Sequence, residues 1–110
     1  MMEKKKIIII EDQPLLNSMM QKTLACDFDV VATSTTAKDM LDLAKEYKPD
    51  LILTDVITEY SANGISYGKK VKDLYGNLVK VLAITGIPDI TFLNEAKRSK
   101  LDGLIYKDID

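Results

Sequence analysis

The sequence predicts an α/β fold in which helices cover a doubly wound, five-stranded parallel sheet. Two observations lead to this prediction. Short apolar runs alternate along the chain with segments whose apolar residues recur at helical spacing. The runs are continuously apolar, which is typical of parallel strands buried on both faces. With 110 residues and 46% hydrophobic content, we expect one domain with one core across residues 1–110.

The first strand is expected at residues 7–10, which are four consecutive isoleucines. A helix then begins at Pro14, because the first turn of a helix does not need the missing N–H of proline. Its apolar residues recur three and four positions apart, and we expect it to end near Cys26. Residues 28–33 are rich in β-branched side chains and predict the second strand.

The middle of the chain repeats this alternation. Thr35 or Thr36 can cap a second helix, and Pro49 ends it. Residues 51–54 form another continuous apolar run and predict the third strand. A polar loop then leads to Gly64 and to a third helix.

The last part of the chain supplies two further strands. Gly76 suits the end of the third helix, and residues 79–84 predict the fourth strand. Pro88 and Asp89 open a fourth helix, and Gly103 separates it from a short fifth strand at residues 104–106. The sequence stops soon after that strand, so we expect the fifth helix of such a fold to be absent.

Polar residues follow four of the five predicted strands. Glu11 and Asp12 follow the first, Asp55 the third, Thr85 the fourth and Lys107 the fifth. The carboxyl ends of parallel strands share one edge, where open α/β sheets bind ligands. The sequence therefore predicts one acidic site at this edge.

This site combines three carboxylates with one lysine. Two like charges at ~4 Å repel by about 4 kcal/mol at an effective dielectric constant of 20, so Lys107 alone cannot balance them. Either some carboxyl groups stay protonated through raised pKa values, or a hard dication binds their oxygens. Mg²⁺ suits this arrangement, because it needs only one or two carboxylates and leaves a position for a phosphoryl oxygen.

A carboxylate in this setting can act as a nucleophile toward phosphorus. Asp55 is the candidate, while the metal and Lys107 neutralise the transferring group. Thr85 would then donate its hydroxyl to the new phosphoryl group, and the loop after the fourth strand would move inward. Such a rearrangement constitutes a switch.

Composition narrows the possible functions and surroundings. A net charge of −2 gives no electrostatic footprint for nucleic acid, so we expect no direct DNA contact by this domain. The run at residues 7–10 is too short to span a bilayer. Cys26 is the single cysteine, which fits a reducing, cytoplasmic location, and we expect it to be a buried hydrophobe. Without histidine, the chain cannot form its own phosphohistidine.

Four segments resemble the motifs of a known protein family: IIIIED, LILTD, VLAITG and LIYKD. In this order and spacing they resemble the receiver domain of bacterial two-component response regulators, whose fold is flavodoxin-like (CheY-like). The resemblance implies that Asp12, Asp55 and the backbone carbonyl of Ile57 ligate Mg²⁺, and that Glu11 completes the acidic pocket. It also implies that Asp55 accepts a phosphoryl group from the phosphohistidine of a sensor histidine kinase.

By the same resemblance, Thr85 and Lys107 would sense the phosphoryl group. Some residues depart from the family pattern. Leu104 stands where the family has a switch aromatic, and Tyr106 directly precedes the lysine. The loop at residues 56–64 lacks the common proline and is about one residue longer than usual. These departures put the aromatic switch and the loop geometry in question.

The expected context is a longer transcriptional regulator. Asp108 follows the lysine where many relatives have proline, a variant associated with helix-turn-helix output domains. DNA would then be contacted by an output domain outside this chain. A sheet left uncovered by the absent fifth helix would expose apolar surface, so a second copy of the chain is an expected partner.

Two other functions stay open, although we do not expect an enzyme. A phosphatase of the haloacid dehalogenase kind also uses a strand-end Asp nucleophile, but it has a second Asp where this chain has Ile57. The other alternative is a pseudo-receiver that serves as a phosphorylation-independent interaction module. Leu104 and the unusual loop at residues 56–64 suggest it.

Overall fold

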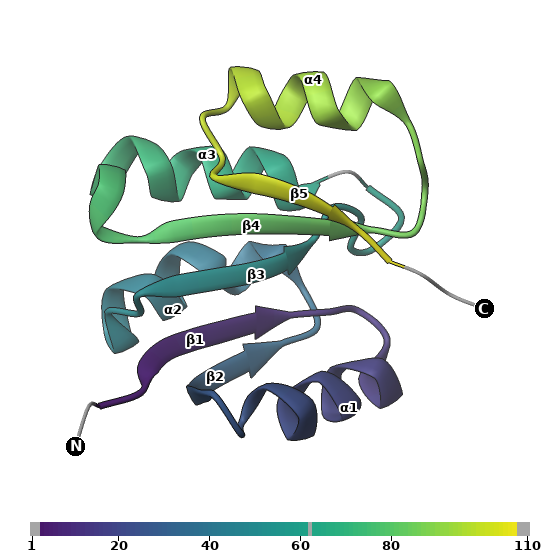
Figure 1. Cartoon of the computed structure of the whole chain (residues 1–110). Coiled ribbons are helices and arrows are strands. Elements are labelled where there is room, and N and C mark those ends of the chain that lie inside the picture. The colour runs from purple at the N-terminus through teal and green to yellow at the C-terminus, as the bar shows by residue number, and fades with distance from the viewer. Residues whose placement is uncertain (1–2, 62, 108–110) are drawn as a thin grey trace.

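The computed structural model describes residues 3–61 and 63–107 of the chain (Figure 1). Within them, five strands form one sheet in the order β2-β1-β3-β4-β5. All neighbouring strands are parallel, which confirms the predicted doubly wound architecture. The strands are β1 (Lys5–Ile10), β2 (Phe28–Ser34), β3 (Leu51–Asp55), β4 (Lys80–Thr85) and β5 (Gly103–Tyr106).

Four α-helices connect these strands in the described part of the chain. They are α1 (Pro14–Leu24), α2 (Met40–Tyr47), α3 (Asn63–Tyr75) and α4 (Ile90–Arg98). Two short 3₁₀ helices, η1 (Ala37–Asp39) and η2 (Gly76–Leu78), precede α2 and β4. The helices α2 and α3 lie together against the sheet, and α4 lies near β5 (Figure 1). None of the described helices is long and apolar enough to cross a membrane.

The main core lies between the sheet and the pair of helices α2 and α3. Ile8 and Ile10 of β1 pack with Ile52 of β3 on this side. Met40 of α2 and Val71 of α3 meet them and are fully buried. Side chains alternate along a strand, so the other face of β1 carries Ile7 and Ile9, which are buried as well. Burial on both faces explains why the run is continuously apolar.

Local signals in the sequence set most element boundaries correctly. Thr36 caps η1 by accepting a hydrogen bond from Lys38 N at 3.2 Å, and Asp89 caps α4 by accepting one from Thr91 N at 2.8 Å. Lys48 ends α2 in the left-handed conformation with φ 47°, and its N–H bonds to Ala44 O, as in a left-handed C-cap. Gly76 follows α3 with φ 56°, as expected of a glycine at this position.

Some expectations were wrong. Gly103 lies within β5 and pairs with Leu82, so it does not separate the helix from the strand. Cys26 is exposed, because α1 ends at Leu24 and the cysteine falls in the turn before β2.

On β5, Ile105 and Tyr106 are 43% and 47% exposed. Within the described residues no helix follows β5, and the variant at Asp108 lies outside them.

Candidate functional site

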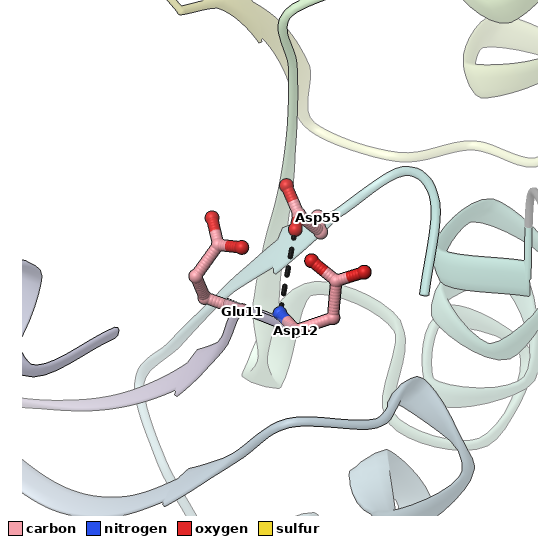
Figure 2. A group of neighbouring side chains, drawn as sticks. All are labelled: Glu11, Asp12 and Asp55. Carbon is pink, nitrogen blue, oxygen red and sulfur yellow. Dashed lines mark hydrogen bonds between the residues drawn. The ribbon is translucent and has the colours of Figure 1, made fainter. Parts of the chain in front are cut away.

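The predicted site residues lie along the carboxyl edge of the sheet. Glu11 and Asp12 directly follow β1, and Asp55 ends β3. Carboxylate oxygens of these three residues lie within 4.8 Å of one another (Figure 2). Ile10 pairs with Thr54 across the β1–β3 ladder, so the residues that follow in each strand are brought together. The predicted convergence of three carboxylates is therefore present in the structure.

Lys107 joins two of these carboxylates. Its Nζ lies 2.7 Å from Glu11 Oε1 and 2.7 Å from Asp55 Oδ1. The side chains of Glu11 and Asp55 are almost completely buried, whereas that of Lys107 is 16% exposed. A single ammonium group thus forms ion pairs with two buried acids. Asp12 is the third acid of the cluster and is more exposed.

Backbone amides at the start of α1 also face the carboxylates. Gln13 N donates a hydrogen bond to Glu11 Oε2 at 3.1 Å. Asp12 N donates to Asp55 Oδ2 at 3.5 Å, which is the outer limit for such a bond (Figure 2). These amides contribute partial positive charge near the N-terminus of a helix. They leave most of the negative charge of the cluster uncompensated.

Burial and the neighbouring charged groups shift the pKa values of the cluster. The pKa of Asp55 is raised from 3.8 to about 7, because burial and the hydrogen bond with Glu11 together outweigh the opposing effect of Lys107. Burial also opposes ionisation of Glu11, but its bonds with Asp55, Lys107 and the Gln13 amide leave the pKa of Glu11 lowered. Burial lowers the pKa of Lys107, yet the two carboxylates outweigh it and the pKa is raised. The pKa of Asp55 therefore lies near neutral pH, whereas that of the neighbouring Glu11 lies below its usual value.

The donor set fits a hard divalent cation. Carboxylate oxygens within a few ångströms of each other are the ligands preferred by Mg²⁺, which also keeps several waters. Burial and the neighbouring Glu11 raise the pKa of Asp55, so added positive charge at the cluster would lower it. A dication would supply that charge and favour the ionised form of Asp55. Glu11, Asp12 and Asp55 are therefore suited to hold Mg²⁺.

Thr85 lies at the same edge but outside the carboxylate cluster. Its hydroxyl accepts a hydrogen bond from Ile87 N at 3.1 Å, and its carbonyl accepts one from Lys107 N at 2.7 Å. Among the described residues, neither Asp55 nor Glu11 bonds with the hydroxyl. A hydroxyl that only accepts still has its own proton to donate. Thr85 is thus placed at the end of β4, as predicted, with a donor not yet used.

Ile57 lies two residues beyond Asp55, in a loop that contacts the protein interior. Its side chain packs with Phe92 and Leu104 around a second cluster of buried residues. The contacts of Leu104 with this cluster contrast with the exposure of Tyr106, although both residues belong to β5. The position of the family's switch aromatic is therefore filled by an aliphatic side chain that packs inward.

Three residues near the site were not assigned any role from the sequence. Gly64 N donates to Val56 O, and a Cβ added at Gly64 would lie 1.8 Å from the carbonyl oxygen of Asp55. Only glycine allows α3 to approach the backbone of Asp55 so closely. The sequence signal for this role was the glycine itself at the start of a predicted helix, because glycine is a poor helix former.

Asn17 is the second such residue, and it is buried on α1. Its Nδ2 donates to Glu11 O at 3.1 Å and to Ser34 O at 3.0 Å, and its Oδ1 accepts from Gln21 Nε2 at 2.9 Å. Asn17 therefore ties the ends of β1 and β2 together beneath the site. The third residue, Thr58, lies in the loop after Asp55 and is fully buried.

Comparisons with known proteins agree with this fold and site. Residues 7–110 match the response regulator receiver domain family, and the chain belongs to this family. It is similar to the transcriptional regulatory protein LnrK of Bacillus subtilis, with 31% identity over 106 residues that make up 94% of this chain and 47% of that protein. It is also similar to the transcriptional regulatory protein DegU of Brevibacillus brevis, with 28% identity over 96% of this chain and 44% of that protein.

Among solved structures, a DNA-binding response regulator of the LuxR family from Staphylococcus aureus has the same fold. The TM-score is 0.86 at 22% identity, over 96% of this chain and 88% of that chain. The chain spans about half the length of the two curated relatives. It is therefore a receiver domain related to transcriptional regulators.

Proposed function

We propose that Asp55 accepts a phosphoryl group from the phosphohistidine of a sensor histidine kinase. The observation that carries this proposal is the contact of Lys107 with Asp55 within a cluster of three carboxylates. One Asp55 oxygen bonds to phosphorus while the bond from phosphorus to the imidazole nitrogen breaks. The imidazole keeps the electron pair and takes up a proton. The chain lacks histidine, so the donor is another protein.

The residues around Asp55 prepare it for this step. The three carboxylates and the backbone carbonyl of Ile57 would hold Mg²⁺, which supplies positive charge beside the oxygens of the transferring group. Lys107 lies within reach of the same oxygens because it already contacts Asp55. Its ammonium lowers the pKa of Asp55 and so helps to keep the nucleophile ionised.

Thr85 would couple phosphorylation to a change of surface. Its hydroxyl proton is available for a phosphoryl oxygen, and its hydroxyl is bonded to Ile87 N in the following loop. A hydrogen bond from Thr85 to the phosphoryl group would therefore move the loop that leads to α4. The exposed part of β5 lies beside this region, so we propose that α4 and β5 form the surface that changes.

The wider role follows from the relatives. LnrK and DegU are named transcriptional regulatory proteins, so we propose that phosphorylation of this domain controls transcription through a helix-turn-helix output domain. In that arrangement the output domain contacts DNA and this domain does not. We also propose a cytoplasmic location, a second copy of the chain as a partner, and a phosphoacceptor role in place of enzymatic turnover.

One observation favours a second candidate function. Leu104 packs inward where the family has its switch aromatic, so phosphorylation could not be transmitted by an aromatic side chain at that position. A phosphorylation-independent interaction module would not need one. The two functions differ in whether Asp55 is modified at all.

Intact-mass measurement after incubation with acetyl phosphate and Mg²⁺ tests the proposal. We expect the parent protein to gain one phosphoryl group and Asp55→Asn to gain none. Asp29→Asn is the matched control, because Asp29 is exposed on β2 away from the site and its variant should be modified like the parent. No gain by a folded parent would favour the interaction module. A gain in Asp55→Asn equal to that of the parent would place the phosphoacceptor elsewhere.

A further inference from the structure

The loop after Asp55 contains a small hairpin. Thr58 N donates to Ser61 O at 3.0 Å, and Ser61 N donates to Thr58 O at 3.1 Å. Between them, Glu59 and Tyr60 both have positive φ, at 55° and 62°. Two such residues form a type I′ turn, which normally requires Asn or Gly at these positions. The long loop predicted from the sequence is therefore a closed turn held in an uncommon conformation.

The side chain of Thr58 anchors this turn in the interior. Its Oγ1 accepts a hydrogen bond from Ala37 N at 3.2 Å and donates one to Asn63 Oδ1. Thr58 and Ala37 are both fully buried, so water cannot replace these bonds. One hydroxyl thus joins the loop to the start of η1 and to the first residue of α3.

Ile57 lies between two fixed neighbours. Val56 N donates to Ile84 O at 2.9 Å, and Val56 O accepts from Gly64 N at 2.9 Å. Thr58 is held by its own side chain and by Ser61. Within the residues that the structure describes, no hydrogen bond ends on the Ile57 carbonyl. The orientation of the peptide that follows Ile57 therefore depends on the hydrogen bonds made by Thr58.

We propose that Thr58 is a positioning residue for the divalent cation of the site. Its hydroxyl holds the loop so that the carbonyl of Ile57 keeps one orientation, and the cation does not have to order the loop when it binds. This inference rests on the proposed function, in which that carbonyl is a ligand. Residues that orient metal ligands commonly change metal affinity by about 10- to 100-fold when they are replaced. Two residues with positive φ would also relax if the anchor were lost, since strained backbone persists only where its surroundings hold it.

Isothermal titration with Mg²⁺ tests this role. Thr58→Val keeps the shape of the side chain and removes the hydroxyl, so we expect Mg²⁺ to bind about 10-fold more weakly. Thr58→Ser keeps the hydroxyl, and we expect its affinity to stay close to that of the parent. Asp102→Asn controls for general destabilisation, because it leaves the buried ammonium of Lys72 without its carboxylate partner at the opposite edge of the sheet. We expect Asp102→Asn to unfold more easily and to bind Mg²⁺ like the parent.

Each outcome decides the inference. It is overturned if folded Thr58→Val binds Mg²⁺ like the parent, or if Thr58→Ser and Thr58→Val lose affinity equally. If Thr58→Val does not fold, Asn63→Ala removes one of the two bonds of the hydroxyl, and we expect about 3-fold weaker binding; unchanged affinity in Asn63→Ala overturns the inference. If the parent itself does not bind Mg²⁺, the proposed metal site fails and Thr58 has no such role.

Discussion

The ammonium of Lys107 lies 2.7 Å from a carboxylate oxygen of Asp55 and 2.7 Å from one of Glu11. One positive charge is thus shared between two buried acids, and Asp12 adds a third acid nearby. The pKa of Glu11 is lowered whereas that of Asp55 is raised to about 7. The negative charge of Asp55 is therefore not fully compensated in the folded protein, and it makes stability depend on pH.

The first prediction concerns this pH dependence in the absence of divalent cations. Since the pKa of Asp55 rises from 3.8 to about 7 on folding, the native state binds more protons than the unfolded state between these values. The free energy of unfolding should therefore fall as pH rises from about 4.5 to about 7, and it should level off above. Urea denaturation at a series of pH values measures this trend.

Asp55→Asn is the control for the pH dependence, because it has no carboxyl group to titrate. We expect its stability to change less than that of the parent over the same range. Glu11 and Asp102 have lowered pKa values, so their effects belong below pH 4.5 and have the opposite sign. Saturating Mg²⁺ should raise the stability of the parent at pH 8 more than that of Asp55→Asn. Equal pH dependence in both proteins would show that Asp55 does not carry the shifted pKa.

The second prediction concerns the close approach of α3 to Asp55. In Gly64→Ala the new Cβ would lie 1.8 Å from the Asp55 carbonyl oxygen, so the helix must move away. We expect a loss of about 2 kcal/mol or more in the free energy of unfolding. If Asp55 is the proposed phosphoacceptor, its displacement should also slow modification by acetyl phosphate by about 10- to 100-fold.

Gly76→Ala separates the two effects of the Gly64 substitution. Gly76 also has a special conformation, with φ 56°, but nothing lies within 4 Å of an added Cβ. This variant should lose about 1 kcal/mol of stability through backbone strain and react with acetyl phosphate at the parental rate. If Gly64→Ala also reacts at the parental rate, its approach to Asp55 is not needed for the chemistry.

The sheet and the acidic cluster could be predicted because each depends on a short-range rule. Continuous apolar runs define parallel strands, and the polar residue after each run is then fixed at the carboxyl edge. Glu11, Asp12, Asp55, Thr85 and Lys107 were all placed at this edge by that rule, and the structure puts them there. The balance of charge was also predictable, since three acids face one lysine.

The supporting residues could not be predicted because their roles depend on contacts between distant segments. Thr58 bonds with Ala37, and Asn17 bonds with Ser34, across loops whose conformations the sequence does not reveal. Cys26 was assigned to the interior from the general behaviour of cysteine, whereas the end of α1 at Leu24 leaves it exposed. Local patterns specify elements, but they do not specify which loops meet.

The third prediction concerns the strained turn at Glu59 and Tyr60. Tyr60 has φ 62° and its side chain is fully exposed, so replacement by glycine removes strain and loses no packing. We expect Tyr60→Gly to be more stable than the parent by about 1 kcal/mol in chemical denaturation. Tyr47→Gly is the matched control at the end of α2, where glycine should destabilise by up to about 1 kcal/mol. Destabilisation by Tyr60→Gly would mean that Tyr60 makes a stabilising contact.

The fourth prediction compares two lysines of α3, one with a buried ammonium and one with an exposed ammonium. Lys72 Nζ donates to Gly76 O, Val79 O and Asp102 Oδ2 at 2.8, 3.0 and 2.8 Å, and its side chain is 5% exposed. The same oxygen of Asp102 also accepts from Val81 N at 2.8 Å, so this group joins α3 to the starts of β4 and β5. Lys72→Met removes the ammonium from two carbonyls and from the Asp102 carboxylate, which is 23% exposed and keeps its bond with Val81 N. We expect it to lose about 2 kcal/mol of stability, chiefly because the two carbonyls lose their donor.

Lys69→Met tests the exposed pair with Asp73 on the same helix, in which both side chains are more than half exposed. Its loss should be no more than about 0.5 kcal/mol, because water screens such a pair. Both lysines lie away from the carboxyl edge, so neither variant should alter modification by acetyl phosphate while it is folded. Equal losses of stability in the two variants would show that burial of the Lys72 ammonium does not determine how much it stabilises the folded protein. A change in the modification rate of folded Lys72→Met would show that the two edges of the sheet are coupled through β4 and β5.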